Sequence, residues 1–381
     1  MIYADNAATT KLDPAAFEAM KPYLLEEYAN ASQPYSFSRK PRKALEEART
    51  TIADCIHAKP NEIFFTSGGT ESNNWVIKSS AFSDSSRRLT IVSAFEHHSL
   101  LHSCSAIEGM GYPVAYLQPS PDGQITTEAL ENCLSRQTRL VSVMFANNEL
   151  GSIQPIEALC EKAHAHGALF HTDAVQAVGH VEIDVRKLGV DFLSASAHKF
   201  NGPKGIGFLY IREGAPLSPY ADGGAQEKGY RAGTENVSGI VGMATALRTN
   251  CNNLETIQQR LRSLERILLA KLHEGGVSFF RNGGTNTLPG LMSLSFPGFS
   301  GEMILHRMDL MGICISTGSA CNSKSIEISH VLRAVSMDEE LARGTVRISL
   351  GKNNTSEDAN AIADPLIRIV CGLSERRTHK D

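Results

Sequence analysis

The sequence has no excess of charge of either sign, no long hydrophobic run and no cysteines in metal-type spacing. A formal net charge of −4 over 381 residues gives no electrostatic reason to expect binding to nucleic acid or to an anionic membrane. Residues 1–10 lack the basic and then apolar pattern of a signal peptide, and no stretch approaches the ~20 apolar residues of a membrane span, so we expect neither. The eight cysteines include no CxxC pair, which favours reduced thiols in the cytoplasm.

Short apolar runs alternate with helix-like stretches in the first part of the chain. These runs occupy residues 62–66, 89–94, 140–146, 168–174, 191–197 and 205–211. The alternation predicts an α/β domain with a largely parallel sheet. The last two runs are too close for a crossover helix, so we expect them to be antiparallel.

The pattern changes near Cys251, where a long amphipathic stretch at 254–276 leads into strand-like runs at 290–298 and 345–351. This second pattern predicts a smaller α+β domain. The expected organisation is an N-terminal segment that packs with the small domain, a large domain and the small domain, at residues 1–12, 13–250 and 251–381. Within the last of these, we expect residues 374–381 to be disordered.

Lys199 stands out because it follows a strand-like run and precedes a turn rich in glycine and proline, SAHKFNGPKG. Most lysines are solvated surface charges. The end of a strand beside Ser196 and His198, however, is where an α/β protein presents side chains to a ligand. A lysine in such a place can form a Schiff base with an aldehyde such as pyridoxal phosphate.

Two further segments supply the parts that this cofactor would need. Asp173 ends another apolar run and could pair with the pyridinium nitrogen, although taken alone it could equally cap a helix. The turn TSGGTESNN provides Gly68 and Gly69 between a strand-like run and a helix-like stretch, an arrangement that favours phosphate.

A histidine pair follows the run at 89–94. His97 could stack on a flat cofactor ring and move protons. The spacing of His98 and His102 also permits zinc, but no third ligand accompanies them, so we expect no metal.

Cys321 lies in a run of small and hydroxylated residues, STGSACNSKS. A core cysteine normally lies among Val, Leu and Ile. We interpret Cys321 as a loop thiol that has to reach a reaction partner; the alternative is a cysteine that is merely exposed and reactive.

Taken together, these motifs resemble those of cysteine desulfurases of the NifS/IscS type, which are fold-type I pyridoxal-phosphate enzymes. The matching segments, in chain order, are YADNAATT, SGGTESNN, EHHS, NNELGSIQPI, HTDAVQAVGH, SAHKFNGPKGIG, RAGTENV, STGSACNS and VRISLG. The form GSAC resembles group I of the family. The resemblance implies a large domain with a mostly parallel seven-stranded sheet flanked by helices, a smaller α+β domain, and a cytoplasmic homodimer.

The resemblance also implies roles for individual residues. Lys199 would bind the cofactor covalently, Asp173 would keep its ring nitrogen protonated and His97 would stack on the ring. Further cofactor contacts would come from Gly69, Thr70, Asn148, Gln176, Ser196 and His198, and from Thr234 of the other subunit. Arg347, assisted by Asn30, would bind the carboxylate of the substrate.

The implied reaction removes sulfur from L-cysteine and yields L-alanine and a persulfide on Cys321. An acceptor protein, such as an iron–sulfur scaffold or a thiolation relay protein, would then take the sulfur. Selenocysteine lyases and small-substrate aminotransferases share this fold, and an inactive scaffold is a third alternative. Cys321 argues against an aminotransferase, and the intact Lys199 and Asp173 argue against a scaffold.

One segment departs from the family pattern. Residues 29–39 read ANASQPYSFSR where the family usually has Gly-Asn-Pro-Ser-Ser, and Tyr35 stands where a histidine is usual. Two interpretations stay open: a specialised subgroup dedicated to one acceptor, and neutral drift in a tolerant loop.

Overall fold

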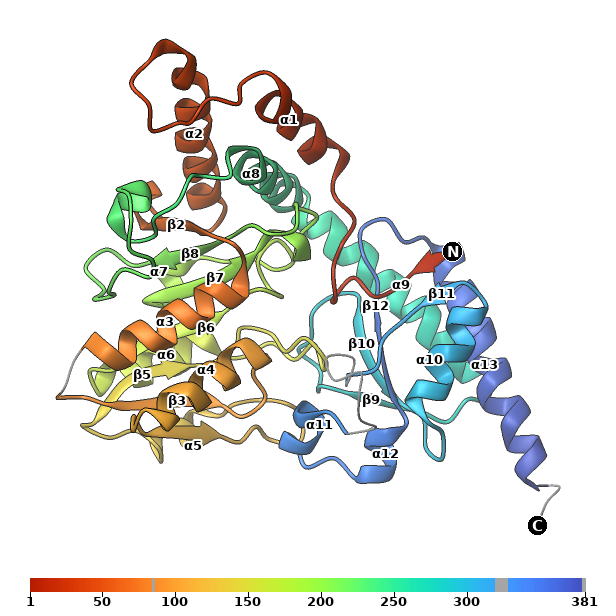
Figure 1. Cartoon of the computed structure of the whole chain (residues 1–381). Helices are drawn as coiled ribbons and strands as arrows, with labels where there is room; N and C mark the ends of the chain where they lie inside the picture. Colours follow the sequence, from red (N-terminus) through yellow and green to blue (C-terminus); the bar gives the residue numbers. More distant parts are fainter. Residues whose placement is uncertain (84–85, 319–327, 379–381) are drawn as a thin grey trace.

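The computed structural model describes residues 1–83, 86–318 and 328–378, and it places two groups of elements side by side (Figure 1). The larger group is built on a seven-stranded sheet and the smaller on a three-stranded sheet. This arrangement confirms the predicted fold class.

The large sheet is mostly parallel. Its order is β2 (Ile63–Thr66), β8 (Gly207–Ile211), β7 (Phe192–Ser196), β6 (Leu169–Asp173), β5 (Thr138–Ser142), β3 (Leu89–Ser93) and β4 (Val114–Leu117). The strands from β7 to β4 are parallel, whereas β8 is antiparallel to both of its neighbours. The antiparallel pairing predicted for the last two runs is therefore confirmed. Strand β4 was not predicted, because it is short and most of its residues are only partly buried.

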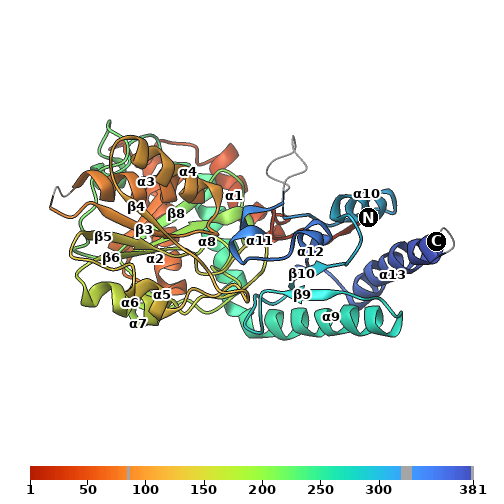
Figure 2. The ribbon, with the colours of Figure 1, turned by 90° about the horizontal axis from the view of Figure 1, so that it is seen from below.

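Helices cover both faces of this sheet because successive residues of each strand point to opposite faces. Phe64 packs in the cluster that includes α3 (Gly69–Ser83) and α4 (His98–Gly109), whereas its neighbour Phe65 packs in the cluster on the other face. Figure 2 shows α3 and α4 above the sheet and α5, α6 and α7 below it. The other helices of the large group are α1 (Pro14–Leu25), α2 (Arg39–Cys55), α5 (Thr127–Glu131), α6 (Ile156–Ala165), α7 (Val185–Leu188) and α8 (Val237–Asn252).

The smaller group has its own core. Its antiparallel sheet has the order β12 (Thr345–Ser349), β10 (Leu291–Ser295) and β9 (Phe280–Asn282). The helices of this group are α9 (Leu254–Glu274), α10 (Gly301–Leu310), α11 (His330–Ala334), α12 (Glu339–Arg343) and α13 (Ser356–Thr378). The junction between α8 and α9 lies close to the predicted boundary at residue 250, and the domain limits stay a prediction. The predicted disorder of the tail is wrong for residues 374–378, which continue α13.

Strand β12 has two different faces. Val346 and Ile348 are fully buried in the core of the smaller group. Alternate residues of a strand point the other way, so Arg347 leaves that core and faces the larger group.

The N-terminal residues connect the two groups. Strand β1 (Ile2–Tyr3) pairs in parallel with β11 (Ile313–Cys314), as Figure 1 shows near the label N. Asn6 N then donates to Ser349 O at 3.0 Å, and Thr10 N donates to His198 O at 2.9 Å. This path carries residues 7 and 8 across the face of the larger group.

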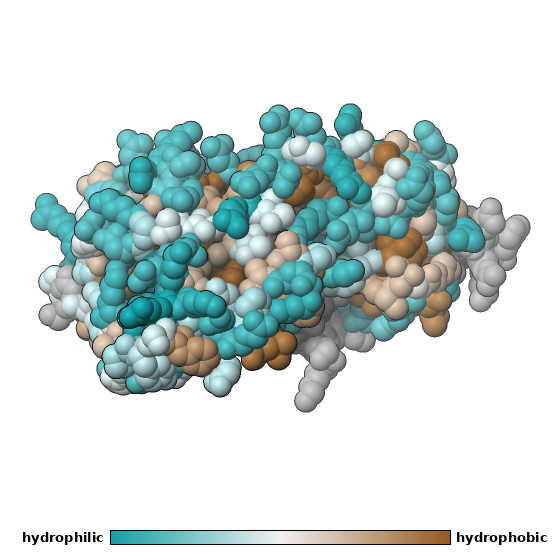
Figure 3. Space-filling view, turned by 90° about the horizontal axis from the view of Figure 1, so that it is seen from above, coloured by the Kyte–Doolittle hydropathy of each residue, from teal (hydrophilic) through white to brown (hydrophobic). Residues whose placement is uncertain are grey.

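The face of the molecule in Figure 3 is mainly hydrophilic, with scattered apolar side chains. Within residues 1–83, 86–318 and 328–378, no helix combines the length and the apolar character needed to cross a membrane.

Candidate active site

A cavity of about 630 Å³ lies where the carboxyl ends of the central strands face β12 and the N-terminal segment. Such strand ends are the usual ligand-binding edge of an α/β sheet. The residues predicted from the sequence that line it are Gly69, Thr70, His97, Asn148, Asp173, Gln176, Ser196, His198, Lys199 and Arg347. The fold therefore gathers most of the predicted site in one place.

Asp173 is buried at the end of β6. Its Oδ2 accepts a hydrogen bond from Asn73 Nδ2 at 2.6 Å, and its Oδ1 accepts one from Val175 N at 3.0 Å. These donors hold a carboxylate at the floor of the cavity. Asn73 lies within a motif used in the sequence analysis, but its role was missed because its residue type does not distinguish it from its neighbour Asn74.

His97 caps the N-terminus of α4. Its Nδ1 accepts a hydrogen bond from Ser99 N at 3.1 Å, so a neutral ring carries its proton on Nε2. Burial lowers the pKa of His97, and Lys199 adds to this effect while Asp173 opposes it. His97 lines the cavity, where a neutral imidazole can stack on a flat group.

Lys199 ends a short 3₁₀ turn, η3 (Ala197–Lys199), that follows β7. Its Nζ donates to Ala7 O at 2.6 Å and to Ala8 O at 2.9 Å. Gln176 Nε2 also donates to Ala7 O, at 3.0 Å. These carbonyl acceptors were not predicted, because a backbone group leaves no trace in residue type.

His198 lies directly beside Lys199. Burial, followed by the positive charges of Lys199 and Lys204, lowers the pKa of His198 to about 4. Its Nδ1 lies 3.1 Å from Thr9 Oγ1. His198 is therefore a neutral hydrogen-bonding group near pH 7.

The turn before α3 packs closely against strand β7. Gly68 has a φ of 147°, which favours glycine, and a Cβ added at Gly69 would lie 2.5 Å from Val175 Cγ2. There is consequently no room for a side chain at Gly69, and the N-terminus of α3 opens onto the cavity. Backbone N–H groups at a helix N-terminus favour an anion such as phosphate.

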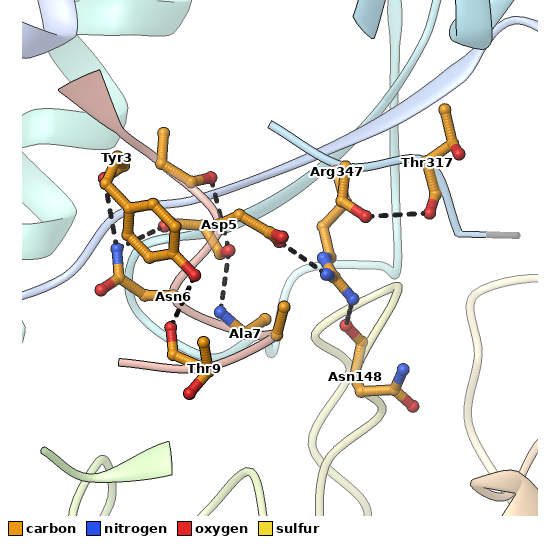
Figure 4. Close-up of polar contacts among 12 residues, drawn as sticks. Tyr3, Asp5, Asn6, Ala7, Thr9, Asn148, Thr317 and Arg347 are labelled. Atoms are coloured by element: carbon orange, nitrogen blue, oxygen red, sulfur yellow. Dashed lines mark hydrogen bonds and ion pairs between the residues drawn. The ribbon is translucent and has the colours of Figure 1, made fainter. Parts of the chain in front are cut away.

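Arg347 is held from two sides (Figure 4). Its Nη2 lies 2.7 Å from Asp5 Oδ1, and its Nη1 donates to Asn148 O at 2.9 Å. Its Nε is buried and has no hydrogen-bond acceptor among the described residues. The guanidinium therefore keeps N–H donors available for a further carboxylate. Asp5 was not predicted.

The backbone of Arg347 is paired with the chain that leads toward Cys321. Arg347 N donates to Ser316 O at 2.7 Å, and Ser316 N donates to Arg347 O at 3.0 Å. Thr317 and Gly318 line the cavity. Cys321 itself lies outside the described residues.

Two predicted site residues are not among the described residues that line the cavity, Asn30 and Thr234. The Oδ1 of Asn30 accepts a hydrogen bond from Ser32 N at 2.9 Å. The contact expected of Thr234 would cross to another subunit. Both roles stay predictions.

The residues present fit pyridoxal phosphate. Lys199 supplies an amine for the aldehyde, Asp173 a carboxylate for the ring nitrogen and His97 a flat ring for stacking. The Gly68–Gly69 turn supplies the anion site, where a Cβ would collide with its neighbours. Four separate parts of the fold thus offer the four features that this cofactor requires.

Two relatives named cysteine desulfurase match nearly the whole chain. The cysteine desulfurase IscS of Dictyoglomus turgidum is 46% identical over 371 residues, covering 97% of this chain and 94% of the relative. The cysteine desulfurase IscS of Methanosarcina thermophila is 44% identical over 370 residues, covering 97% and 92%.

Two solved structures also match nearly the whole chain. A NifS-like protein superposes with a TM-score of 0.91 at 35% identity, covering 97% of this chain and 99% of the other. A structure described as SspA in complex with cysteine has a TM-score of 0.83 at 36% identity, covering 93% and 100%. The Aminotransferase class-V family profile matches residues 2–362. The resemblance predicted from the motifs is confirmed, and the chain belongs to the class-V aminotransferase family of pyridoxal-phosphate-dependent enzymes.

Proposed function

We propose that the chain is a cysteine desulfurase, which converts L-cysteine to L-alanine and carries the sulfur as a persulfide on Cys321. One observation carries the proposal: the backbone pairing of Arg347 with Ser316. It joins the arginine suited to a substrate carboxylate to the chain that leads to Cys321, at the edge of the cavity that contains Lys199. The relatives named cysteine desulfurase and the neighbour solved with cysteine support this substrate.

Pyridoxal phosphate, when bound, supplies an electron-withdrawing ring that stabilises negative charge at the α-carbon of the substrate. The residues of the chain prepare this chemistry. The Asp173 carboxylate, whose orientation Asn73 fixes, would hold a proton on the ring nitrogen. The turn at Gly68 and Gly69 would hold the phosphate.

Substrate binding and proton movement fall to two other residues. Arg347 binds the α-carboxylate with the N–H donors that Asp5 and Asn148 leave available. Lys199 removes the α-proton through its Nζ, which the carbonyl groups of residues 7 and 8 direct toward the cavity.

The sulfur step balances without an added oxidant. The thiolate of Cys321 attacks Sγ of the substrate, so an S–S bond forms while the Cβ–Sγ bond breaks. The electron pair of the broken bond stays on the substrate carbon, which takes up protons and leaves as L-alanine. The net change is L-cysteine plus a thiol giving L-alanine plus a persulfide.

The persulfide would pass to a sulfur-acceptor protein, such as an iron–sulfur scaffold or a thiolation relay protein; the IscS name of the relatives supports this class of partner. We also propose a homodimer in which Thr234 contributes to the cavity of the other subunit. A cytoplasmic location agrees with the free thiols of Cys55, Cys104, Cys133, Cys160, Cys251, Cys314 and Cys371.

The test compares wild type with Cys321→Ser and with Cys133→Ser as a matched control at a cysteine away from the cavity. Sulfide and alanine are measured from L-cysteine with a thiol reductant, and the cofactor absorbance of each protein is recorded. We expect equal amounts of sulfide and alanine from wild type and Cys133→Ser, and neither product from Cys321→Ser despite normal absorbance. Turnover that survives in Cys321→Ser would favour a lyase or an aminotransferase instead.

A further inference from the structure

Glu149 is a buried carboxyl group that none of the steps above uses. It is 5% exposed and lies in the turn between β5 and α6. The turn is fixed by Asn147, whose Oδ1 accepts from Glu149 N at 2.8 Å and from Leu150 N at 2.9 Å. A buried carboxyl on a rigid turn can hold its hydrogen-bond partners in a defined position.

The partners of Glu149 are the described residues on either side of the segment that contains Cys321. Its Oε2 accepts a hydrogen bond from Ser329 Oγ at 2.6 Å. On the other side, a Cβ added at Gly318 would lie only 2.0 Å from the same Oε2 and 3.3 Å from Ser329 Cβ. Gly318, Glu149 and Ser329 are therefore packed around one oxygen atom.

The same turn also contacts the site that we assign to the substrate carboxylate. The carbonyl group of Asn148 accepts a hydrogen bond from Arg347 Nη1 at 2.9 Å. Adjacent residues of one turn thus touch the arginine and both flanks of the Cys321 segment. Burial raises the pKa of Glu149 to about 7.

We propose that Glu149 is a positioning residue for sulfur transfer: it fixes Gly318 and Ser329, described residues on the two sides of the Cys321 segment, beside the turn that contacts Arg347. This inference rests on the proposed function, because it gives Cys321 the role of sulfur carrier. Glu149 is not among the described residues that line the cavity, so we expect its loss to affect the sulfur step more than amino-acid binding.

The main test measures persulfide formation in a single turnover by mass spectrometry, together with steady-state kcat and KM for L-cysteine. We expect Glu149→Ala to lower the single-turnover rate and kcat at least about tenfold, since small misplacements of a reacting group cost that much or more. KM, cofactor absorbance and the spectral response to L-alanine should stay within about twofold of wild type. Glu149→Gln should restore most of the rate, because its amide oxygen can still accept from Ser329 Oγ.

Gly318→Ala provides an independent test that keeps Glu149 in place. Its methyl group meets Glu149 Oε2, so we expect the single variant to lose rate as Glu149→Ala does. In the double variant the methyl group enters the space left by the carboxyl, so the two losses should not add. The matched control is Glu157→Ala, an exposed acid on α6, which should behave as wild type.

The outcomes separate the inference from the function on which it rests. A Glu149→Ala protein with the wild-type single-turnover rate, or additive losses in the double variant, would overturn the role of Glu149 alone. If Glu149→Ala does not fold, an unimpaired Gly318→Ala would overturn it equally. Wild type that forms no persulfide on Cys321 would overturn the proposed function instead.

Discussion

Asn73 Nδ2 donates a 2.6 Å hydrogen bond to Oδ2 of Asp173 and thereby ties α3 to the end of β6. Both residues are almost fully buried. The same Nδ2 also donates to Ser99 Oγ at 2.9 Å, and Ser99 in turn bonds to His97. One amide therefore connects the carboxylate beneath the cavity with the turn that holds the imidazole.

Replacing Asn73 by Ala should weaken cofactor binding, because Asp173 loses a charge-assisted hydrogen bond within a buried site. Such bonds contribute about 1.5–3 kcal/mol, so the dissociation constant of the cofactor should rise by roughly tenfold to a hundredfold. Titration of the apoprotein, followed by absorbance, measures it. Asn74→Ala is the control, since that side chain donates to Thr70 O of its own helix and makes no other hydrogen bond within the described part of the chain. Equal affinities for the two variants would contradict this role of Asn73.

Gly69→Ala should also impair cofactor binding, for a steric reason. Its Cβ would lie 2.5 Å from Val175 Cγ2, so Gly69, the first residue of α3, has to shift, and the helix N-terminus that would receive the phosphate shifts with it. We expect Gly69→Ala to lose its bound cofactor on dialysis under conditions in which wild type retains it. Gly109→Ala is a matched control, since a Cβ there meets nothing within 4 Å. If Gly69→Ala retained all of its cofactor, the turn would be able to accommodate a methyl group without loss of the phosphate site.

Asp5→Ala should destabilise the fold. It leaves the guanidinium of Arg347, whose side chain is 8% exposed, without its carboxylate partner. Removing one member of a buried ion pair typically costs about 3–5 kcal/mol. Urea unfolding measures this loss, which we expect to be near the lower end because the Asp5 side chain is 19% exposed. The exposed Asp222→Ala serves as control, and an equal unfolding midpoint for both variants would argue against the ion pair.

Glu149 should make stability depend on pH in a defined direction. Burial raises its pKa from 4.5 to about 7, while Ser329 and the positive charge of Arg347 act in the opposite direction. Between these values the folded chain keeps a proton that the unfolded chain has lost, so this residue lowers stability as the pH rises.

Glu149→Gln removes this effect. Between pH 5 and pH 8, the free energy of unfolding of Glu149→Gln should therefore increase relative to that of wild type, by up to about 3 kcal/mol. Urea unfolding of both proteins at the two pH values gives the measurement. A difference that stays constant with pH would mean that Glu149 titrates normally.

Much of the site could be predicted because many of its residues lie at the carboxyl ends of strands. Asp173 and Lys199 follow neighbouring parallel strands, and the carboxyl ends of such strands meet at one edge of the sheet. Arg347 needed the family resemblance, because an arginine in a strand is usually a surface residue.

The features that were missed have no distinct signature in residue type. Strand β4 is short and only partly buried, so no apolar run marks it. The acceptors of Lys199 are backbone carbonyl groups of two alanines. Asn73, Asp5 and Glu149 lie within quoted motifs, but their partners are distant in the sequence, and only the folded chain brings them together.

The pairing of β1 with β11 has a consequence for the order in which the chain matures. Ile2 is synthesised before the whole larger sheet, whereas its partner Ile313, and Ser349, whose carbonyl group accepts from Asn6 N, are synthesised after it. Contacts between such distant residues form slowly, because a long loop has to close. The larger sheet can therefore assemble during translation, whereas residues 1–10 can take their place beside the cavity only afterwards. A nascent chain should thus become able to retain its cofactor only after residues up to Ser349 have left the ribosome.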